Sequence, residues 1–146
     1  AVKGPTGCRY LNDERQMDYV QNGWNITGDA CLITEDGYIA YHTRFDDMII
    51  TAGYNVSGLE VENTILDHPK VAECAVVGIK DDARGQIVGA YVVAANGVSA
   101  NHQLDLDLKD YVKSRIAPYK YPRWWNFVDA LPKTATGKIQ RFKLRH

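Results

Sequence analysis

The sequence predicts an α+β fold: a small mixed sheet flanked by helices, preceded by a β-rich segment with a weaker core. From residue 46 onward, hydrophobic patterns follow one another in the order strand, helix, strand, strand, helix, strand. Before that point, polar and irregular segments alternate with breakers and short extended runs. We therefore expect two domains, residues 1–44 and residues 45–146.

Residues 1–44 contain turns and short strands. Breakers at residues 3–7 and at Asn22-Gly23 interrupt the chain, residues 30–33 are strand-like, and the clearest extended run covers residues 37–41. Polar residues between these runs leave few positions for a hydrophobic core. We expect small β elements with little packing of their own.

The second domain opens with a strand at residues 48–51 and a turn at residues 52–55. Ser57 then precedes Glu60 by three residues, which is the capping box that begins a helix. Pro69 ends this helix. Its apolar positions lie on neighbouring faces, with Leu59, Asn63 and Leu66 near one face and Val61 and Ile65 beside them.

Two valine-rich segments, residues 71–79 and 87–95, are separated by a turn and predict neighbouring strands. Apolar residues then recur at helical spacing from residue 102 to 116, ahead of Pro118. Residues 123–128 predict the last strand. These elements complete a compact domain of about a hundred residues, the usual size of one domain.

Composition excludes several classes of protein. Apolar residues make up 45% and charged residues 24% of the chain, as in globular proteins, and no stretch approaches the ~20 apolar residues of a membrane span. No signal peptide is visible. The cysteines are odd in number and lack metal-type spacing, namely Cys8, Cys31 and Cys74. They predict reduced, buried thiols in a cytoplasmic protein with no metal site.

Charge is distributed unevenly along the chain. Up to Leu108 there are 7 basic and 16 acidic residues, a net charge of −9, whereas residues 109–146 hold 10 basic and 2 acidic residues, a net charge of +8. A basic surface of this kind faces a polyanion. The phosphates of a nucleotide cofactor fit better than nucleic acid, because the tract lacks a regular basic helix with interleaved aromatic residues.

A lysine near the C-terminus stands in a loop of small residues. The run LPKTATGKIQR occupies residues 131–141, where Pro132 limits the entry, Gly137 allows close approach of the backbone, and Lys138 offers three donors to an anionic oxygen. Taken alone, this run also fits a solvated basic tail. Its interpretation depends on the motifs that precede it.

Two earlier motifs bear acidic groups in loops. The run GWNITGD, residues 23–29, places Asp29 after a glycine, where its carboxylate can accept hydrogen bonds from both hydroxyls of a ribose or form an Asx turn. The run RFDD, residues 44–47, stands at the junction of the two domains. Adjacent acids point apart and no third ligand is near, so Asp46 fits a hinge or a solvated turn better than a metal or acid/base pair.

In this order and at these separations, the motifs resemble the C-terminal part of AMP-forming acyl-CoA synthetases, in the adenylate-forming superfamily. The resemblance covers nearly the whole chain. It rests on GWNITGD at residues 23–29, RFDDMII at 44–50, GYN at 53–55, EVE at 60–62 and PKTATGKIQR at 132–141. One departure is Thr43, which stands where the family usually has glycine, so the local backbone is expected to differ there.

The resemblance implies the chemistry and the residues. A carboxylic acid reacts with ATP to give an acyl-adenylate and pyrophosphate, and the coenzyme A thiol then attacks the adenylate. Asp29 would hold the ribose hydroxyls, Arg44 the ribose or a nearby phosphate, and Lys138 the carboxylate and α-phosphate oxygens. Gly53, with Tyr54 beside it, would line the pantetheine tunnel, and Asp46 would be the hinge.

The resemblance also implies a missing partner. The phosphate loop, the acyl pocket and the Mg²⁺ that accompanies ATP belong to a large N-terminal domain, of which residues 1–44 would be the C-terminal end and residues 45–146 the mobile lid. The chain alone is then expected to be inactive. The opening run, residues 2–11, looks most like benzoate- and 2-aminobenzoate-CoA ligases, which implies an aromatic acid.

Three other functions stay open at the level of sequence. An adenylation domain that loads a carrier protein would share Asp29 and Lys138, and so would a luciferase-like monooxygenase. A free-standing nucleotide-binding or interaction module would use the basic C-terminal third as a docking surface.

Overall fold

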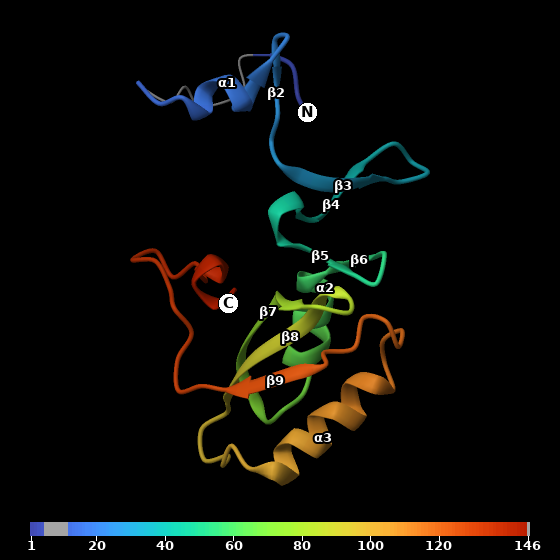
Figure 1. The fold of residues 1–146 in the computed structure, drawn as a ribbon, viewed down its shortest axis with the longest axis vertical. Coiled ribbons are helices and arrows are strands. Elements are labelled where there is room, and N and C mark those ends of the chain that lie inside the picture. The colour runs from blue at the N-terminus through green and yellow to red at the C-terminus, as the bar shows by residue number, and fades with distance from the viewer. Residues whose placement is uncertain (5–11, 146) are drawn as a thin grey trace. The chain divides into compact units, whose positions relative to one another are not determined.

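The computed structural model describes residues 1–4 and 12–145 and divides the chain into two compact units, Ala1–Asp46 and Asp47–His146 (Figure 1). The division falls two residues after the boundary expected from the sequence. Cys8 and most of the breaker at residues 3–7 and of the opening run at residues 2–11 lie outside the described residues.

The first unit is built from short β elements, as expected. Helix α1 (Arg15–Tyr19), which the sequence did not predict, leads into the antiparallel pair β1 (Val20–Gln21) and β2 (Trp24–Asn25). Strands β3 (Asp29–Ile33) and β4 (Ile39–Arg44) form a second antiparallel pair. The extended run begins two residues later than predicted, because Gly37 donates its N–H to the Thr34 carbonyl in the turn between the strands.

Apolar side chains of the β3–β4 hairpin are largely exposed within this unit. Ile33 and Ile39 are cross-strand partners and are 80% and 72% exposed. Three further large apolar side chains on the hairpin are also exposed, namely Leu32, Tyr38 and Tyr41. Thr43 is buried, has a negative φ and pairs with Ala30 in the ladder, and the strand register shifts directly after this pair.

The second unit contains the predicted mixed sheet. Its strand order is β6-β5-β8-β7, and β9 pairs with β8 in parallel while the other pairs are antiparallel. The strands are β5 (Met48–Thr51), β6 (Tyr54–Ser57), β7 (Val71–Asp81), β8 (Gly85–Ala94) and β9 (Trp124–Phe127). The two valine-rich strands are neighbours, as predicted, with Val76 opposite Ala90.

The predicted turn at residues 52–55 is shorter in the structure, because strand β6 begins at Tyr54. Ala52 and Gly53 form a two-residue hairpin turn with φ of 47° and 83°. Positive φ at both positions is the geometry that closes a two-residue hairpin between twisted strands, and glycine adopts it without strain. The sequence prediction missed β6 because its four residues lie between the turn and the helix cap.

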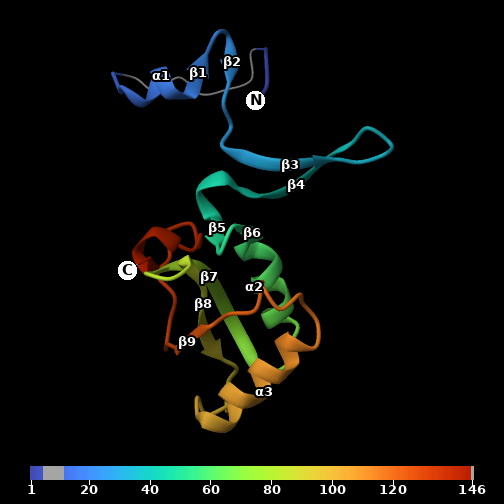
Figure 2. The same cartoon turned by 45° about the vertical axis from the view of Figure 1, so that its right-hand side comes forward.

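The two faces of the sheet have separate cores. Helices α2 (Gly58–Leu66) and α3 (His102–Lys113) cover one face, and the C-terminal segment with the 3-10 helix η2 (Arg141–Leu144) covers the other (Figure 2). Strand β7 alternates between them, since Val76 belongs to the helix side and Ala75 and Val77 to the other. The second unit thus places its C-terminal segment across the sheet from its helices.

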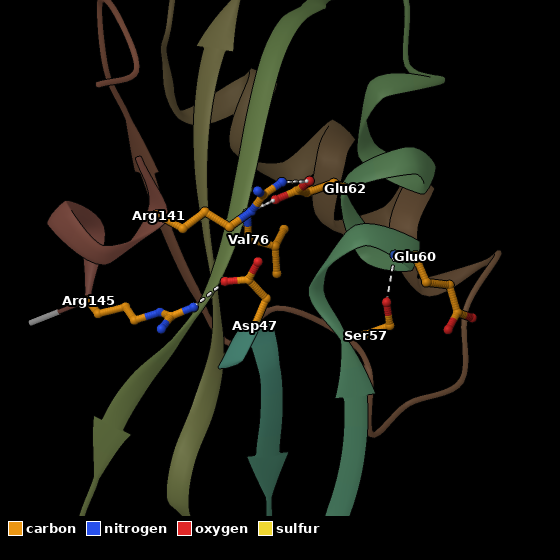
Figure 3. Close-up of polar contacts among 7 residues, drawn as sticks. All are labelled: Asp47, Ser57, Glu60, Glu62, Val76, Arg141 and Arg145. Atoms are coloured by element: carbon orange, nitrogen blue, oxygen red, sulfur yellow. Dashed lines mark hydrogen bonds and ion pairs between the residues drawn. The ribbon is translucent and has the colours of Figure 1, made fainter. Parts of the chain in front are cut away.

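Helix α2 begins as predicted, with the Ser57 hydroxyl accepting the Glu60 N–H at 3.4 Å (Figure 3). Its buried face is centred on Val61 and Ile65, whereas Leu66 is 41% exposed. Helix α3 is capped by Asn101 and ends at Lys113, three residues before the predicted end. The Arg115 and Ile116 N–H groups still donate to the Val112 carbonyl, and Ile116 packs against the core, so the apolar periodicity continues past the end of the helix.

Cys74 is buried, as predicted, and its burial raises the pKa of the thiol, with the negative charge of Glu62 adding to the shift. The prediction of burial was wrong for Cys31, which is exposed on β3. Within residues 1–4 and 12–145, none of the helices has the length and apolar character needed to cross a membrane.

Candidate functional site

Asp29 and Arg44 are brought together by the β3–β4 ladder. They are directly paired in the register, and Arg44 Nη1 donates to Asp29 Oδ1 at 2.8 Å. The same nitrogen donates to the Thr27 carbonyl at 2.8 Å, which fixes the guanidinium beside the carboxylate. Both side chains remain partly accessible, with 49% of Arg44 and 28% of Asp29 exposed.

A hollow of about 780 Å³ in the first unit is lined by Asp29 and Arg44 and also by Asp46. The other lining residues are Arg15, Asp18, Tyr19, Ile26, Thr27 and Gly28. A carboxylate has about four acceptor positions, so the bond from Arg44 leaves Asp29 able to accept hydroxyl donors. The hollow can therefore take a polar molecule that bears hydroxyls.

The junction between the units lies in a short 3-10 helix, η1 (Phe45–Asp47). Asp46 is exposed and belongs to the first unit, whereas Asp47 belongs to the second and forms an ion pair with Arg145 (Figure 3). The two adjacent carboxylates therefore belong to different units. Nowhere in the described part of the chain do three or more His, Cys, Asp or Glu side chains gather as metal ligands would.

Gly53 and Tyr54 lie at the β5–β6 turn of the second unit. Tyr54 is 54% exposed, and its ring stacks on Tyr119, with 4.5 Å between centroids and 19° between planes. Next to it, Lys120 pairs with Glu60. The structure thus adds Tyr119 to the predicted pair, from a loop that follows α3. Its only signal in sequence was an aromatic residue beside Pro118 and Lys120.

Lys138 lies in a small hairpin whose backbone is closed on itself. Thr134 donates its N–H to the Lys138 carbonyl at 2.8 Å, and the Thr134 hydroxyl accepts the Lys138 N–H at 3.1 Å. Lys133 and Ile139 form a β-bridge below the turn. The Lys138 side chain is exposed at the tip. The predicted loop is therefore an ordered hairpin, in which Lys133 is paired with Glu73 and the Lys138 side chain is exposed.

The second unit presents its two predicted segments in different places. In Figure 1 the C-terminal segment with the lysine hairpin lies to the left of the sheet, and the β5–β6 turn lies to the right. Asp29, Arg44 and Asp46 share one hollow in the first unit. The predicted residues thus form three groups, in which Lys138 is separate from Gly53 and Tyr54.

Sequence reasoning missed one group near the lysine hairpin. Glu62 on α2 is 3% exposed and binds Arg141, which follows Lys138 by three residues. Glu62 lies in the motif EVE and Arg141 in PKTATGKIQR, but the sequence did not indicate a role for either residue. An acid beside Val61 on the buried face of the predicted helix was the signal, since a buried carboxylate needs a cationic partner.

A family model described as the AMP-binding enzyme C-terminal domain matches residues 60–138. The chain belongs to this family of AMP-binding enzymes. The match includes EVE and the lysine hairpin, and it confirms the resemblance found in the sequence. Because the match begins inside α2, it does not include Asp29, Arg44 and Asp46. The roles predicted for these residues depend on the resemblance and on the geometry of the first unit.

Curated relatives of this AMP-binding enzyme chain are CoA ligases. Benzoate–CoA ligase of Thauera aromatica is 44% identical over 146 residues, which cover 99% of this chain and 28% of that ligase. 4-Hydroxybutyrate–CoA ligase 1 of Metallosphaera sedula is 42% identical over 136 residues, 93% of this chain and 24% of the relative. The chain thus spans about a quarter of the length of the relatives it matches.

Solved structures of AMP-binding enzymes share the fold. The anthranilate CoA ligase AuaEII in complex with anthranoyl-AMP superposes with a TM-score of 0.81 and 42% identity, over 90% of this chain and 25% of that one. The o-succinylbenzoate CoA synthetase of Bacillus subtilis, in complex with its acyl-adenylate intermediate, gives 0.83 and 37% over 94% and 28%. These matches confirm the predicted α+β fold as that of the C-terminal part of such enzymes.

Proposed function

We propose that this chain is the C-terminal part of an AMP-forming acyl-CoA ligase, which activates a carboxylic acid with ATP and transfers the acyl group to coenzyme A. The observation that supports it best is the second unit itself. It presents the hairpin of Lys138 and the β5–β6 turn, which bears Gly53 and Tyr54, in different places on one compact unit. Two half-reactions with different chemistry can each use one of these surfaces.

In the first half-reaction the carboxylate of the acid attacks the α-phosphorus of ATP, and the bond from that phosphorus to pyrophosphate breaks. Lys138 would stand by the carboxylate and α-phosphate oxygens, where its charge stabilises the transition state more than the ground state. Asp29 would accept hydrogen bonds from the ribose hydroxyls, with Arg44 close enough to reach the ribose or a phosphate. The ion pair between them orients both groups.

In the second half-reaction the coenzyme A thiol loses its proton and attacks the acyl carbonyl, and the bond to AMP breaks. The β5–β6 turn would then replace the lysine hairpin at the reaction centre. Gly53 and Tyr54 would border the path of the thiol arm. Rotation of the second unit about Asp46 exchanges the two surfaces, as hinge dihedrals do in lid closure.

The acid is proposed to be aromatic. Benzoate–CoA ligase matches almost the whole chain, and anthranilate CoA ligase is among the structural neighbours. The 4-hydroxybutyrate–CoA ligase is nearly as similar in sequence, which makes competition between benzoate and 4-hydroxybutyrate the direct test of this assignment. A higher kcat/KM for 4-hydroxybutyrate would overturn it.

The remainder of the ligase is proposed to be a large N-terminal domain of the same polypeptide. The exposed apolar hairpin of β3 and β4 is the surface that we expect this domain to cover. Mg²⁺ would neutralise phosphate charge on ATP and, as the family resemblance implies, would be held by that domain. We propose a cytoplasmic location for the ligase.

Measurement of the two half-reactions tests the proposal in the intact ligase that contains this chain. Lys138→Ala should abolish adenylate formation, followed by pyrophosphate exchange, and should spare thioester formation from supplied acyl-adenylate. Lys143→Ala removes a neighbouring exposed lysine of the same segment and is the matched control. Equal loss of both half-reactions in Lys138→Ala would contradict the assignment of Lys138.

The chain alone, residues 1–146, provides a second test. It should form no acyl-CoA from ATP, benzoate and coenzyme A, and calorimetry should detect weak AMP binding or none. Tight binding of AMP or coenzyme A by the chain alone would favour the free-standing module instead.

A further inference from the structure

Glu62 is a buried carboxylate with a complete set of partners. Only 3% of the residue is exposed, and Arg141 binds it in a bidentate manner, from Nε to Oε1 at 3.0 Å and from Nη2 to Oε2 at 2.7 Å (Figure 3). The backbone N–H of Val76 donates to Oε1 at 2.7 Å. Removal of Arg141 would leave the buried carboxylate of Glu62 without a compensating charge, which is costly, whereas the Arg141 side chain is 25% exposed.

The pair lies at the outer edge of the sheet, where β7 ends the strand order. The Val76 N–H meets Glu62, and its carbonyl faces the start of α2, since a Cβ added to Gly58 would stand 2.9 Å from that oxygen. Helix α2 packs on one face, and Leu131, Ile139 and Leu144 pack on the other. The Glu62–Arg141 pair therefore joins the helix to the C-terminal segment around the edge of β7.

This junction is close to the lysine hairpin along the chain. Arg141 follows Lys138 by three residues, a span of about 10 Å at most. The other end of the hairpin is held by Lys133, whose ion pair with Glu73 at 2.7 Å is 39% and 38% exposed. Exposed pairs fix a side chain weakly, whereas a bidentate pair to a buried carboxylate fixes both position and orientation.

We propose that Glu62 and Arg141 are positioning residues for Lys138, and that they hold its hairpin where the ammonium group meets the reacting oxygens. This inference rests on the adenylation role proposed for Lys138. Displacement of a reacting group by about 1 Å can lower a rate about 100-fold, so a loosened hairpin would slow adenylation without any change to Lys138 itself. The thioester step uses the β5–β6 turn and should be much less affected.

Two substitutions in the intact ligase test the role. Glu62→Gln keeps an acceptor for the Val76 N–H but removes the charge, and Arg141→Lys keeps the charge but cannot bind both oxygens at once. Each should lower kcat for pyrophosphate exchange by about 10- to 100-fold at saturating ATP and acid, the range expected from misplacement. Thioester formation from supplied acyl-adenylate should stay within about 2-fold of the parent, because its reacting groups are not displaced.

Asp107→Asn is the matched control. It removes another ion pair of the second unit, from Lys70 to Asp107 at 2.7 Å, on α3 and away from the hairpin. This variant should leave both half-reactions unchanged. Thermal unfolding of each variant identifies loss of the folded state, and Arg141→Lys, the milder change, decides the question if Glu62→Gln does not fold.

The outcomes separate the two proposals. If Lys138→Ala abolishes adenylation while Glu62→Gln and Arg141→Lys keep the parental rate, the positioning role is wrong and the role of Lys138 stands. If the rates of both half-reactions fall equally in the folded variants, the pair only stabilises the fold, and the inference is also wrong. If Lys138→Ala itself spares adenylation, the proposed function fails first.

Discussion

Asp47, the first residue of the second unit, forms an ion pair with Arg145, 98 residues further along the chain. This ion pair connects the beginning of the second unit to its end, immediately after Asp46. The Tyr91 hydroxyl on β8 also donates to the Leu144 carbonyl at 3.0 Å, which holds the C-terminal segment on the sheet. A rotation between the units would therefore take place at Asp46 and the residues before it.

Asp46→Pro should impair this rotation. Proline fixes its own φ and disfavours helical backbone at the preceding residue, whereas Phe45 lies in the 3-10 helix η1. In the intact ligase we expect one half-reaction to slow by about 10-fold or more, since closure and opening can limit turnover. Single-turnover measurement of each half-reaction checks this. Asp46→Ala, which keeps both dihedrals free, is the control, and parental rates in Asp46→Pro would exclude Asp46 as the hinge.

Asp29→Asn should weaken ATP binding. The amide keeps one acceptor oxygen but loses the charge that orients Arg44 at 2.8 Å. Hydrogen bonds to charged groups contribute about 1.5–3 kcal/mol, so KM for ATP should rise by about 10- to 100-fold. Steady-state kinetics on the intact ligase measure it. Asp36→Asn, in the exposed turn between β3 and β4, should leave KM unchanged, and the same result for Asp29→Asn would remove Asp29 from the site.

Periodicity and turn chemistry predicted most of the second unit. The N-cap at Ser57, the valine-rich pair and the helix from residue 102 are all present, because each is specified by residues close in sequence. Strand β6 was missed because four residues between a turn and a cap carry too little pattern. Cys31 was predicted to be buried, but the hairpin that bears it has few packing partners in the first unit.

The motifs of the candidate site could be identified from sequence, but the contacts that hold their residues in place could not. The pairing of Asp29 with Arg44 follows from a strand register that includes a shift after Ala30. The contact of Glu62 with Arg141 joins residues 79 apart and depends on how α2 and the C-terminal segment pass the edge of β7. Such pairs are set by tertiary packing, which a local pattern does not specify.

Gly58→Ala should destabilise the second unit. The added Cβ would stand 2.9 Å from the Val76 carbonyl oxygen, which is backbone in a buried strand and has little freedom to move. Overpacking of this kind costs about 1–3 kcal/mol. Urea unfolding of the chain, followed by circular dichroism, measures the loss. Asn63→Ala, on the exposed side of the same helix, should change stability by less than about 0.5 kcal/mol. No loss in Gly58→Ala would show that α2 can shift away from β7.

His68 should make the stability of the second unit depend on pH. The residue is 8% exposed, its Nδ1 accepts the Lys70 N–H at 3.3 Å, and its ring meets Tyr111 edge to face at 4.7 Å. Burial lowers the pKa of the imidazole, and the charges of Lys70 and Arg115 lower it further while Asp107 opposes them. The folded state therefore favours neutral His68.

Because the folded pKa is lower than the unfolded value, the unfolded chain binds a proton first as pH falls. The stabilisation is complete above the unfolded pKa of 6.5 and is lost progressively below it. We expect the urea midpoint of the chain to fall between about pH 7.5 and pH 5.5, and to fall less in His68→Asn, whose amide oxygen can accept the Lys70 N–H without titrating. Equal pH slopes in the two proteins would show that His68 protonates as readily in the folded as in the unfolded state.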